Sequence, residues 1–155
     1  SFIPLSKEIE LIELYTKLEH FRFKDKFEYT IVVDENITVS DYNIPPMLLQ
    51  PYIENAVWHG LRYKKEKGEL RIAIQKKTVN TIAISISDNG IGRDKSKALK
   101  TENQKKQNSK GMGNIKKRVS ILNAMYKDKL DVSITDLNTE GEDMGTRVIV
   151  TLTKD

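Results

Sequence analysis

Residues 51 to 61, with the sequence PYIENAVWHGL, contain the first polar side chains whose types suit chemistry. A helix that turns about 100° per residue separates a polar group from the apolar residues Ile53, Ala56, Val57 and Gly60. The polar group consists of Glu54, Asn55, Trp58 and His59. An amide oxygen beside a carboxylate supplies hard oxygen ligands, which Mg²⁺ prefers. The pattern indicates a metal-binding face with Asn55 as the ligand, and the alternative is a face that is merely solvated.

Asp88 lies where a strand with alternating apolar residues ends and two glycines, Gly90 and Gly92, begin. A buried carboxylate accepts hydrogen bonds, so it can bind the exocyclic amine of adenine and would reject the carbonyl group that guanine has at that position. The two glycines allow the backbone to approach a flat ring closely. The alternative interpretation of this DNG segment is an ordinary turn between two strands.

The segment GMGNIKKR, residues 111 to 118, places two glycines before a helix with strong apolar periodicity. Free backbone N–H groups and the positive end of the helix dipole make such a terminus suitable for phosphate, and glycines leave the approach open. The segment matches neither a Walker A loop nor a GxGxxG fingerprint. The alternative is a hinge before an ordinary core helix.

The chain has 155 residues, which suits one domain, and it has no cysteine, so disulfides and thiolate metal sites are excluded. Its net charge of +4 is concentrated in residues 93 to 110, RDKSKALKTENQKKQNSK, a segment without aromatic residues. A nucleic-acid interface is usually spread over one face with interleaved aromatics, so nucleic acid is the least favoured partner. No apolar run is long enough to cross a bilayer.

The polar groups must be positioned by helices and strands that the apolar spacing predicts. A helix is expected over 6 to 22, capped by Ser6, and Pro45 and Pro46 are expected to open a helical segment that restarts at Pro51. The apolar face of the first helix is expected to contain Ile9, Leu11, Ile12, Leu14, Tyr15, Leu18 and Phe21. Strands are expected over 27 to 33 and around Leu70–Ile74, Ile82–Ile86, Leu130–Ile134 and Val148–Leu152, with a further helix ending near residue 126.

Alternating strands of this kind suit a sheet that is covered on one face. We therefore predict an α/β (α+β) two-layer sandwich, with a mixed, mostly antiparallel sheet and helices on one face. A doubly wound parallel sheet is disfavoured.

The motifs IENAVWHG, DNGIG, GMGNIKKR and GTRVIV, in this order, resemble the N, G1 and G2 boxes and the closing GT motif of the GHKL ATPase superfamily. The stretches PLSKEIELIELYTKLEHFRF and PPMLLQPYIENAVWHG are similar to the LytS-type branch of sensor histidine kinases. The resemblance covers nearly the whole chain and implies a Bergerat-type ATP-binding fold.

This resemblance implies a role for each matching residue. Asn55 would coordinate Mg²⁺ at the phosphates of ATP, with Glu54 and His59 beside it as catalytic residues. Asp88 would bind the adenine amine, and Thr146 would assist through a water molecule.

The resemblance also assigns the glycine-rich segments. Gly90 and Gly92 would shape the base pocket, and residues 93 to 110 would form the ATP lid. Phosphates would be held at the far end of the lid by Gly111, Met112, Gly113 and Asn114.

In the resembling kinases, the γ-phosphate of ATP passes to a histidine in a PHFLFN-like context on a separate dimerising domain. That motif is absent from this sequence, whose histidines are His20 and His59. We expect the fragment to bind ATP without autophosphorylation. Residues 1 to 24 are expected to lead in from the missing dimerisation and phosphoacceptor region, and residues 25 to 155 to form the ATP-binding catalytic domain.

The implied partners are the histidine phosphotransfer domain and a response regulator, in a homodimeric sensor whose cytoplasmic part includes this chain and whose missing N-terminal region anchors it in the cell membrane. Three alternatives stay open at this point. The fold could serve a GHKL ATPase or anti-sigma serine kinase, or a non-catalytic nucleotide-sensing module. A nucleic-acid binder is the third.

Overall fold

The computed structural model describes residues 1–24, 26–91, 117–139 and 142–154. The elements are β1 (Ile3–Pro4), α1 (Leu5–Arg22), β2 (Phe27–Val33), η1 (Val39–Asp41), β3 (Asn43–Ile44), α2 (Gln50–His59), η2 (Leu61–Tyr63), β4 (Gly68–Lys76), β5 (Thr81–Asp88), β6 (Leu130–Thr139) and β7 (Glu142–Thr153). Residues 117–125 are also helical. The short β1 and β3 pair with each other, and the sequence did not predict them.

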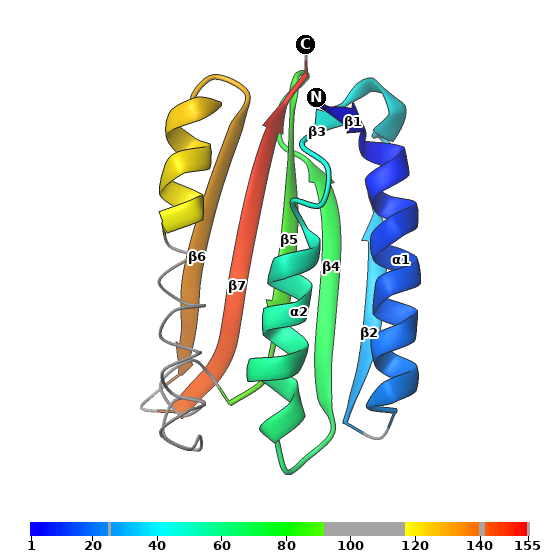
Figure 1. Ribbon diagram of the computed structural model, residues 1–155, viewed down its shortest axis with the longest axis vertical. Coiled ribbons are helices and arrows are strands. Elements are labelled where there is room, and N and C mark those ends of the chain that lie inside the picture. Colours follow the sequence, from blue (N-terminus) through cyan, green and yellow to red (C-terminus); the bar gives the residue numbers. More distant parts are fainter. Residues whose placement is uncertain (25, 92–116, 140–141, 155) are drawn as a thin grey trace.

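The main sheet has the strand order β2-β4-β5-β7-β6. The edge strand β2 runs parallel to β4, whereas the other neighbours are antiparallel. A parallel pair needs a long crossover, which α2 and its flanking segments provide between β2 and β4 (Figure 1). The prediction of a mixed, mostly antiparallel sheet is confirmed.

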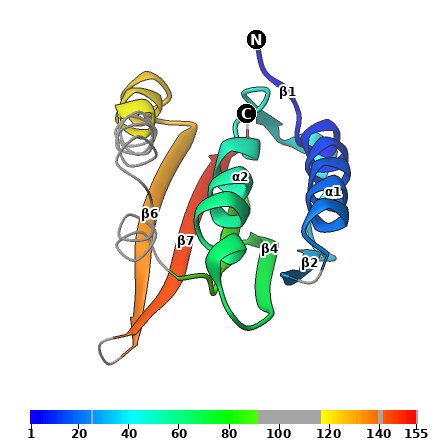
Figure 2. The ribbon, with the colours of Figure 1, turned by 60° about the horizontal axis from the view of Figure 1, so that its bottom comes forward.

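The helices all cover the same face of this sheet, as predicted (Figure 2). Residues that alternate along the strands point toward them, and rows such as Ile72, Ile86 and Val148 continue from strand to strand. The core lies between these rows and the buried residues of the helices. The two-layer arrangement leaves the opposite face of the sheet without a helix among the described residues.

The prediction for the apolar face of α1 is partly wrong. Ile9 and Ile12 are buried together with Leu5, but four of the predicted core residues are exposed: Leu11, Leu14, Leu18 and Phe21. The buried side of α1 instead includes the polar residues Glu8, Thr16 and Glu19. Two of these have hydrogen-bond partners around α2, which makes their burial tolerable.

Two predicted helix starts also differ from the structure. Helix α1 begins at Leu5 after Pro4 and has no side-chain cap, so Ser6 lies inside its first turn. Residues 45–46 lead into a turn rather than a helix, and Met47 has a left-handed φ of 64°. Helix α2 begins at Gln50 with Pro51 in its first turn, where the missing N–H of proline costs no helical hydrogen bond.

The orientation of α1 can be tested by truncating one buried and one exposed residue. Ile12 is 1% exposed and Leu18 is 58% exposed, although the sequence placed both on one face. We expect Ile12→Ala to lower the free energy of unfolding by about 2–5 kcal/mol, because a cavity remains in the core. Leu18→Ala should change it by no more than about 0.5 kcal/mol. Urea unfolding followed by circular dichroism measures both values, and equal losses would contradict this orientation.

Candidate functional site

Asp88 is the last residue of β5, and it continues the inward-facing alternation of Ile84 and Ile86. Its neighbours across the sheet are Leu70 on β4 and Thr146 on β7. The residue is 6% exposed, so the row of core side chains ends in a carboxyl group. A carboxylate is therefore presented at the edge of an apolar layer.

The carboxyl group of Asp88 accepts hydrogen bonds from backbone groups. The N–H of Gly90 donates to Oδ1 at 2.9 Å, and the N–H of Thr146 also donates to the carboxyl. Burial raises the pKa of Asp88 to about 7, while these hydrogen bonds and the charge of Lys64 oppose the rise. Asp88 is thus poised between its charged and neutral forms near neutral pH.

Three glycines surround this carboxyl group at distances that exclude a side chain. A Cβ on Gly60 would lie 2.9 Å from Oδ1 of Asp88, and a Cβ on Gly90 would overlap the backbone of Gly60. Gly145 has a φ of +101°, and a Cβ there would overlap the carbonyl group of Asp88. The C-terminal end of α2, the end of β5 and the part of β7 just before its pairing with β5 therefore meet at Asp88 through bare backbone.

The loop after β5 is held by its own polar contacts. Asn89 Oδ1 accepts a hydrogen bond of 2.6 Å from the N–H of Glu69, and the Lys64 ammonium group donates to the Asn89 carbonyl at 2.6 Å. The N–H of Ile91 donates to the Gly60 carbonyl at 3.4 Å. These bonds fix the loop against the end of α2.

Sequence reasoning missed four residues of this arrangement. Gly60 was assigned to the packed side of a helix and Gly145 only to a motif, and Lys64 and Asn89 were not singled out. The two glycines could have been noticed because each directly adjoins a predicted site residue, His59 or Thr146. No local signal distinguishes Lys64 from the neighbouring lysines.

The structure brings Asp88, Gly90 and Thr146 together, and Asn55 and His59 lie on α2, whose following residue Gly60 contacts Asp88. Asn55 and His59 are half-buried and lie one helical turn apart. His59 directly precedes Gly60, which touches the Asp88 carboxyl. One helix thus connects the amide side chain to the buried carboxyl group.

The other two members of the predicted polar group turn toward α1. Glu54 is exposed. Burial raises the pKa of the Tyr15 hydroxyl, and the charges of Glu19 and Glu54 raise it further. Trp58 is half-buried, and its indole N–H donates to Glu19 on α1 at 2.6 Å. Trp58, which was expected beside Asn55 and His59 on one polar face, therefore also contacts α1.

The remaining predicted site residues lie outside the described part of the chain. These are Gly92, Gly111, Met112, Gly113, Asn114 and the predicted lid, 93–110. Within the described ranges, no three His, Asp or Glu side chains group closely enough to hold a metal ion.

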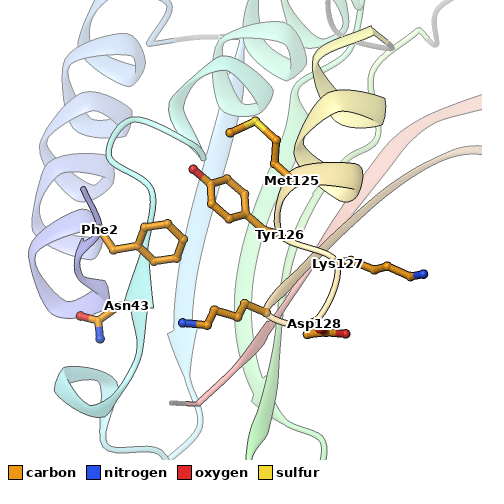
Figure 3. A pocket seen from close by; sticks show the side chains of 7 residues that line it. Phe2, Asn43, Met125, Tyr126, Lys127 and Asp128 are labelled. Carbon is orange, nitrogen blue, oxygen red and sulfur yellow. The ribbon is translucent and has the colours of Figure 1, made fainter.

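A cavity of about 600 Å³ lies at the opposite end of the sheet from Asp88. It opens between the N-terminal segment and the residues after the helix of 117–125, and Figure 3 shows Phe2 and Tyr126 side by side in its lining, with ring centres 5.0 Å apart. Thr81 and Thr153 pair at that end, whereas Asp88 and Thr146 pair at the other. None of the sequence motifs lies at this cavity. We therefore place the candidate functional site at the other end of the sheet, around Asp88.

A family model matches most of the chain. Residues 45–155 match the model of the family described as histidine kinase-, DNA gyrase B- and HSP90-like ATPases. The chain belongs to this ATPase family. The match includes α2, β5 and β7, the elements that meet at Asp88.

The domain is similar to parts of longer sensor proteins. It is 36% identical over 128 residues to the sensor protein LytS of Oceanobacillus iheyensis, which covers 79% of this chain and 21% of that protein. It is 32% identical over 139 residues to the sensor histidine kinase YpdA of Escherichia coli, covering 89% of this chain and 23% of that protein. The chain thus spans less than a quarter of these two relatives and corresponds to the catalytic ATPase domain of LytS-type sensor histidine kinases.

Solved structures share the fold of this ATPase domain. The histidine kinase domain of the Erythrobacter litoralis EL346 blue-light activated kinase has a TM-score of 0.59 at 15% identity, covering 98% of this chain and 62% of that chain. The mycobacterial sensor histidine kinase MprB has a TM-score of 0.58 at 12% identity, covering 94% of this chain and 95% of that chain.

In the described part of the present chain, no helix is long and apolar enough to cross a membrane.

The environment of Asp88 predicts how stability depends on pH. Because its folded-state pKa is raised from 3.8 to about 7, the neutral acid favours the fold, and this contribution is lost as the pH rises through about 7. Between about pH 5 and pH 7, the unliganded wild type should lose up to about 1.4 kcal/mol per pH unit relative to Asp88→Asn. Denaturant unfolding at several pH values measures this difference. Parallel pH profiles for the two proteins would contradict the raised pKa.

Proposed function

We propose that this ATPase domain binds Mg·ATP with the adenine at Asp88 and passes the γ-phosphoryl group to a histidine in another part of a LytS-type sensor kinase. The observation that carries the proposal is the buried Asp88 carboxyl group among three glycines. A charged carboxylate accepts a hydrogen bond from the amine of adenine, and the close backbone approach at Gly60, Gly90 and Gly145 keeps side chains away from Asp88. Thr146, buried beside Asp88, is assigned the water-mediated contact to the base.

The residues on α2 suit the phosphate end of the nucleotide. Asn55 has a half-buried amide oxygen and Glu54 an exposed carboxylate, so hard oxygen donors suited to Mg²⁺ are present. We assign Asn55 as the metal ligand, with Glu54 and His59 as its catalytic neighbours. The glycines at 90 and 92 are assigned to the base pocket, residues 111–114 to the phosphates and residues 93–110 to a lid.

When bound, ATP supplies the phosphoryl group and Mg²⁺ neutralises part of its charge. The chain contributes chiefly position, because phosphoryl transfer depends on alignment and charge stabilisation more than on covalent chemistry. Asp88 fixes the base, and α2 carries Asn55 from that fixed point toward the phosphates. The acceptor histidine, the dimer interface and a response regulator as final receiver are assigned to other chains or regions, and residues 1–24 to the connection with the histidine domain.

Related proteins support this division of labour. The histidine kinase ThkA has been solved in complex with the response regulator TrrA, and its kinase chain shares this fold with a TM-score of 0.53 at 15% identity. A cytoplasmic position in a membrane-anchored dimer is part of the same proposal. Positive charge is concentrated at 93–110, but this charge alone does not support a nucleic-acid partner, and the proposal includes none.

The nucleotide assignment predicts two separable losses of affinity. Asp88→Asn should weaken a non-hydrolysable ATP analogue by about 10–100-fold, because an amide presents its own N–H group in place of an acceptor. Asn55→Ala should remove most of the increase in affinity for the analogue that Mg²⁺ gives, and it should leave the affinity without Mg²⁺ unchanged. Isothermal calorimetry with GTP as the control measures both. Equal affinities for ATP and GTP would contradict the role of Asp88.

The destination of the phosphate can be tested with radiolabelled ATP. The chain alone should release little phosphate, because it lacks the acceptor motif. Addition of the histidine-containing domain of the same sensor should give an acid-labile, base-stable phosphoprotein, as expected for phosphohistidine. Rapid phosphate release by the chain alone would favour a plain ATPase, and an acid-stable product would favour a serine kinase.

A further inference from the structure

The described residues bury five polar or charged side chains, and they fall into two groups. Asp88 and Thr146 belong to the nucleotide site, whereas Glu8, Thr16 and Glu19 all project from α1. Burial of a carboxylate is costly unless it is hydrogen-bonded. The two buried glutamates of α1 therefore need an explanation in terms of what they bind.

Both glutamates bind α2 or the residues that lead into it. Glu8 Oε2 accepts a hydrogen bond of 3.2 Å from the N–H of Leu48, two residues before α2 begins. Glu19 Oε2 accepts a hydrogen bond of 2.6 Å from the indole N–H of Trp58, the penultimate residue of α2. One carboxylate holds the start of the helical segment, and the other holds its end.

The spacing of these contacts matches on the two segments. Glu8 and Glu19 lie about three helical turns apart on α1, and Leu48 and Trp58 enclose almost the same length of chain. Helices α1 and α2 are in contact and run in the same direction (Figure 1). A two-point attachment of this kind restrains both the axial position and the rotation of α2.

Two guanidinium groups and an aromatic ring pack around the hydrogen bond between Trp58 and Glu19. The Arg22 guanidinium lies 3.8 Å from Glu19 Oε1 and 5.4 Å from the centre of the Trp58 ring. Arg62 approaches the same ring at 5.3 Å, and Phe23 meets it edge-on at 5.1 Å. The indole therefore has one fixed orientation.

We propose that Glu8 and Glu19 are positioning residues that hold α2 from its two ends and thereby aim Asn55 at the metal and phosphates. Asn55 lies between the two attachment points, whereas Asp88 is held by strands β4 and β7 independently of α1. The inference rests on the proposed function, because it assumes that Asn55 is the metal ligand. The adenine part of the site is then held by the sheet and by the contact of Gly60 with Asp88, whereas the position of Asn55 along α2 also depends on α1.

The test compares the affinity for a non-hydrolysable ATP analogue with and without Mg²⁺ in single and double variants. Trp58→Phe removes the donor but keeps an aromatic ring, and Glu19→Met removes the acceptor but keeps the volume. Each should reduce the Mg²⁺-dependent gain in affinity by about tenfold, because small misplacements of a ligating group are costly. Metal-free affinity should change by less than about twofold, and the double variant should lose no more than the worse single variant.

Thr16→Val is the matched control. Thr16 lies on the same buried side of α1 between the two glutamates, and its hydroxyl has no hydrogen-bond partner among the described residues. The valine has the same shape, so this variant should keep the full Mg²⁺-dependent gain. Glu8→Met removes the other attachment point and should reduce the Mg²⁺-dependent gain in affinity as Glu19→Met does.

The outcomes distinguish this inference from the proposed function. If the wild type shows no Mg²⁺-dependent gain, or if Asn55→Ala retains it, the proposed function itself is wrong. If the wild type depends on Asn55 but Trp58→Phe and Glu8→Met retain the gain, the positioning role is overturned. A loss of metal-dependent and metal-free binding in equal proportion, with a matching fall in unfolding free energy, would also overturn it.

Discussion

The backbone contact between Gly60 and Gly90 is the constraint on which the rest of the site depends. It brings the C-terminal end of α2 against the loop after β5, with no side chain between them. The same contact places backbone against the Asp88 carboxyl group, whose burial raises its pKa while the hydrogen bond from Gly90 opposes the rise. A methyl group at either glycine would push the helix away from the sheet and separate the two halves of the proposed nucleotide site.

The sheet and α1 position different parts of the molecule. The sheet provides a rigid apolar layer whose last inward-facing residue on β5 is Asp88, and its neighbours on β4 and β7 fix that carboxyl. Helix α1 contributes two carboxylates that hold α2, at the cost of burying charge in place of apolar surface. Strands and helices together form the apolar core, while polar contacts set where the helix with Asn55 lies.

Much of this fold could be predicted because the strands alternate strictly. Asp88 continues this alternation to the inner side of the sheet, although the sequence pattern placed it only at the end of a strand. The inner face of α1 could not be predicted, because the helix carries apolar side chains on all its sides. In addition, the hydrogen-bond partners of Glu8 and Glu19 are 40 and 39 residues away in sequence. The roles of Gly60 and Gly145 were hidden for the same reason, since a close approach depends on segments distant in sequence. The metal and phosphate assignments stay predictions.

Nuclear magnetic resonance of the isotope-labelled domain with an ATP analogue tests the central claim most directly, because it locates the adenine ring. The account predicts contacts between adenine protons and the backbone of Gly60, Gly90 and Thr146, with large shifts of their amide signals. Contacts at the other end of the sheet, around Phe2 and Tyr126, would contradict it, because the nucleotide would then occupy the distant cavity.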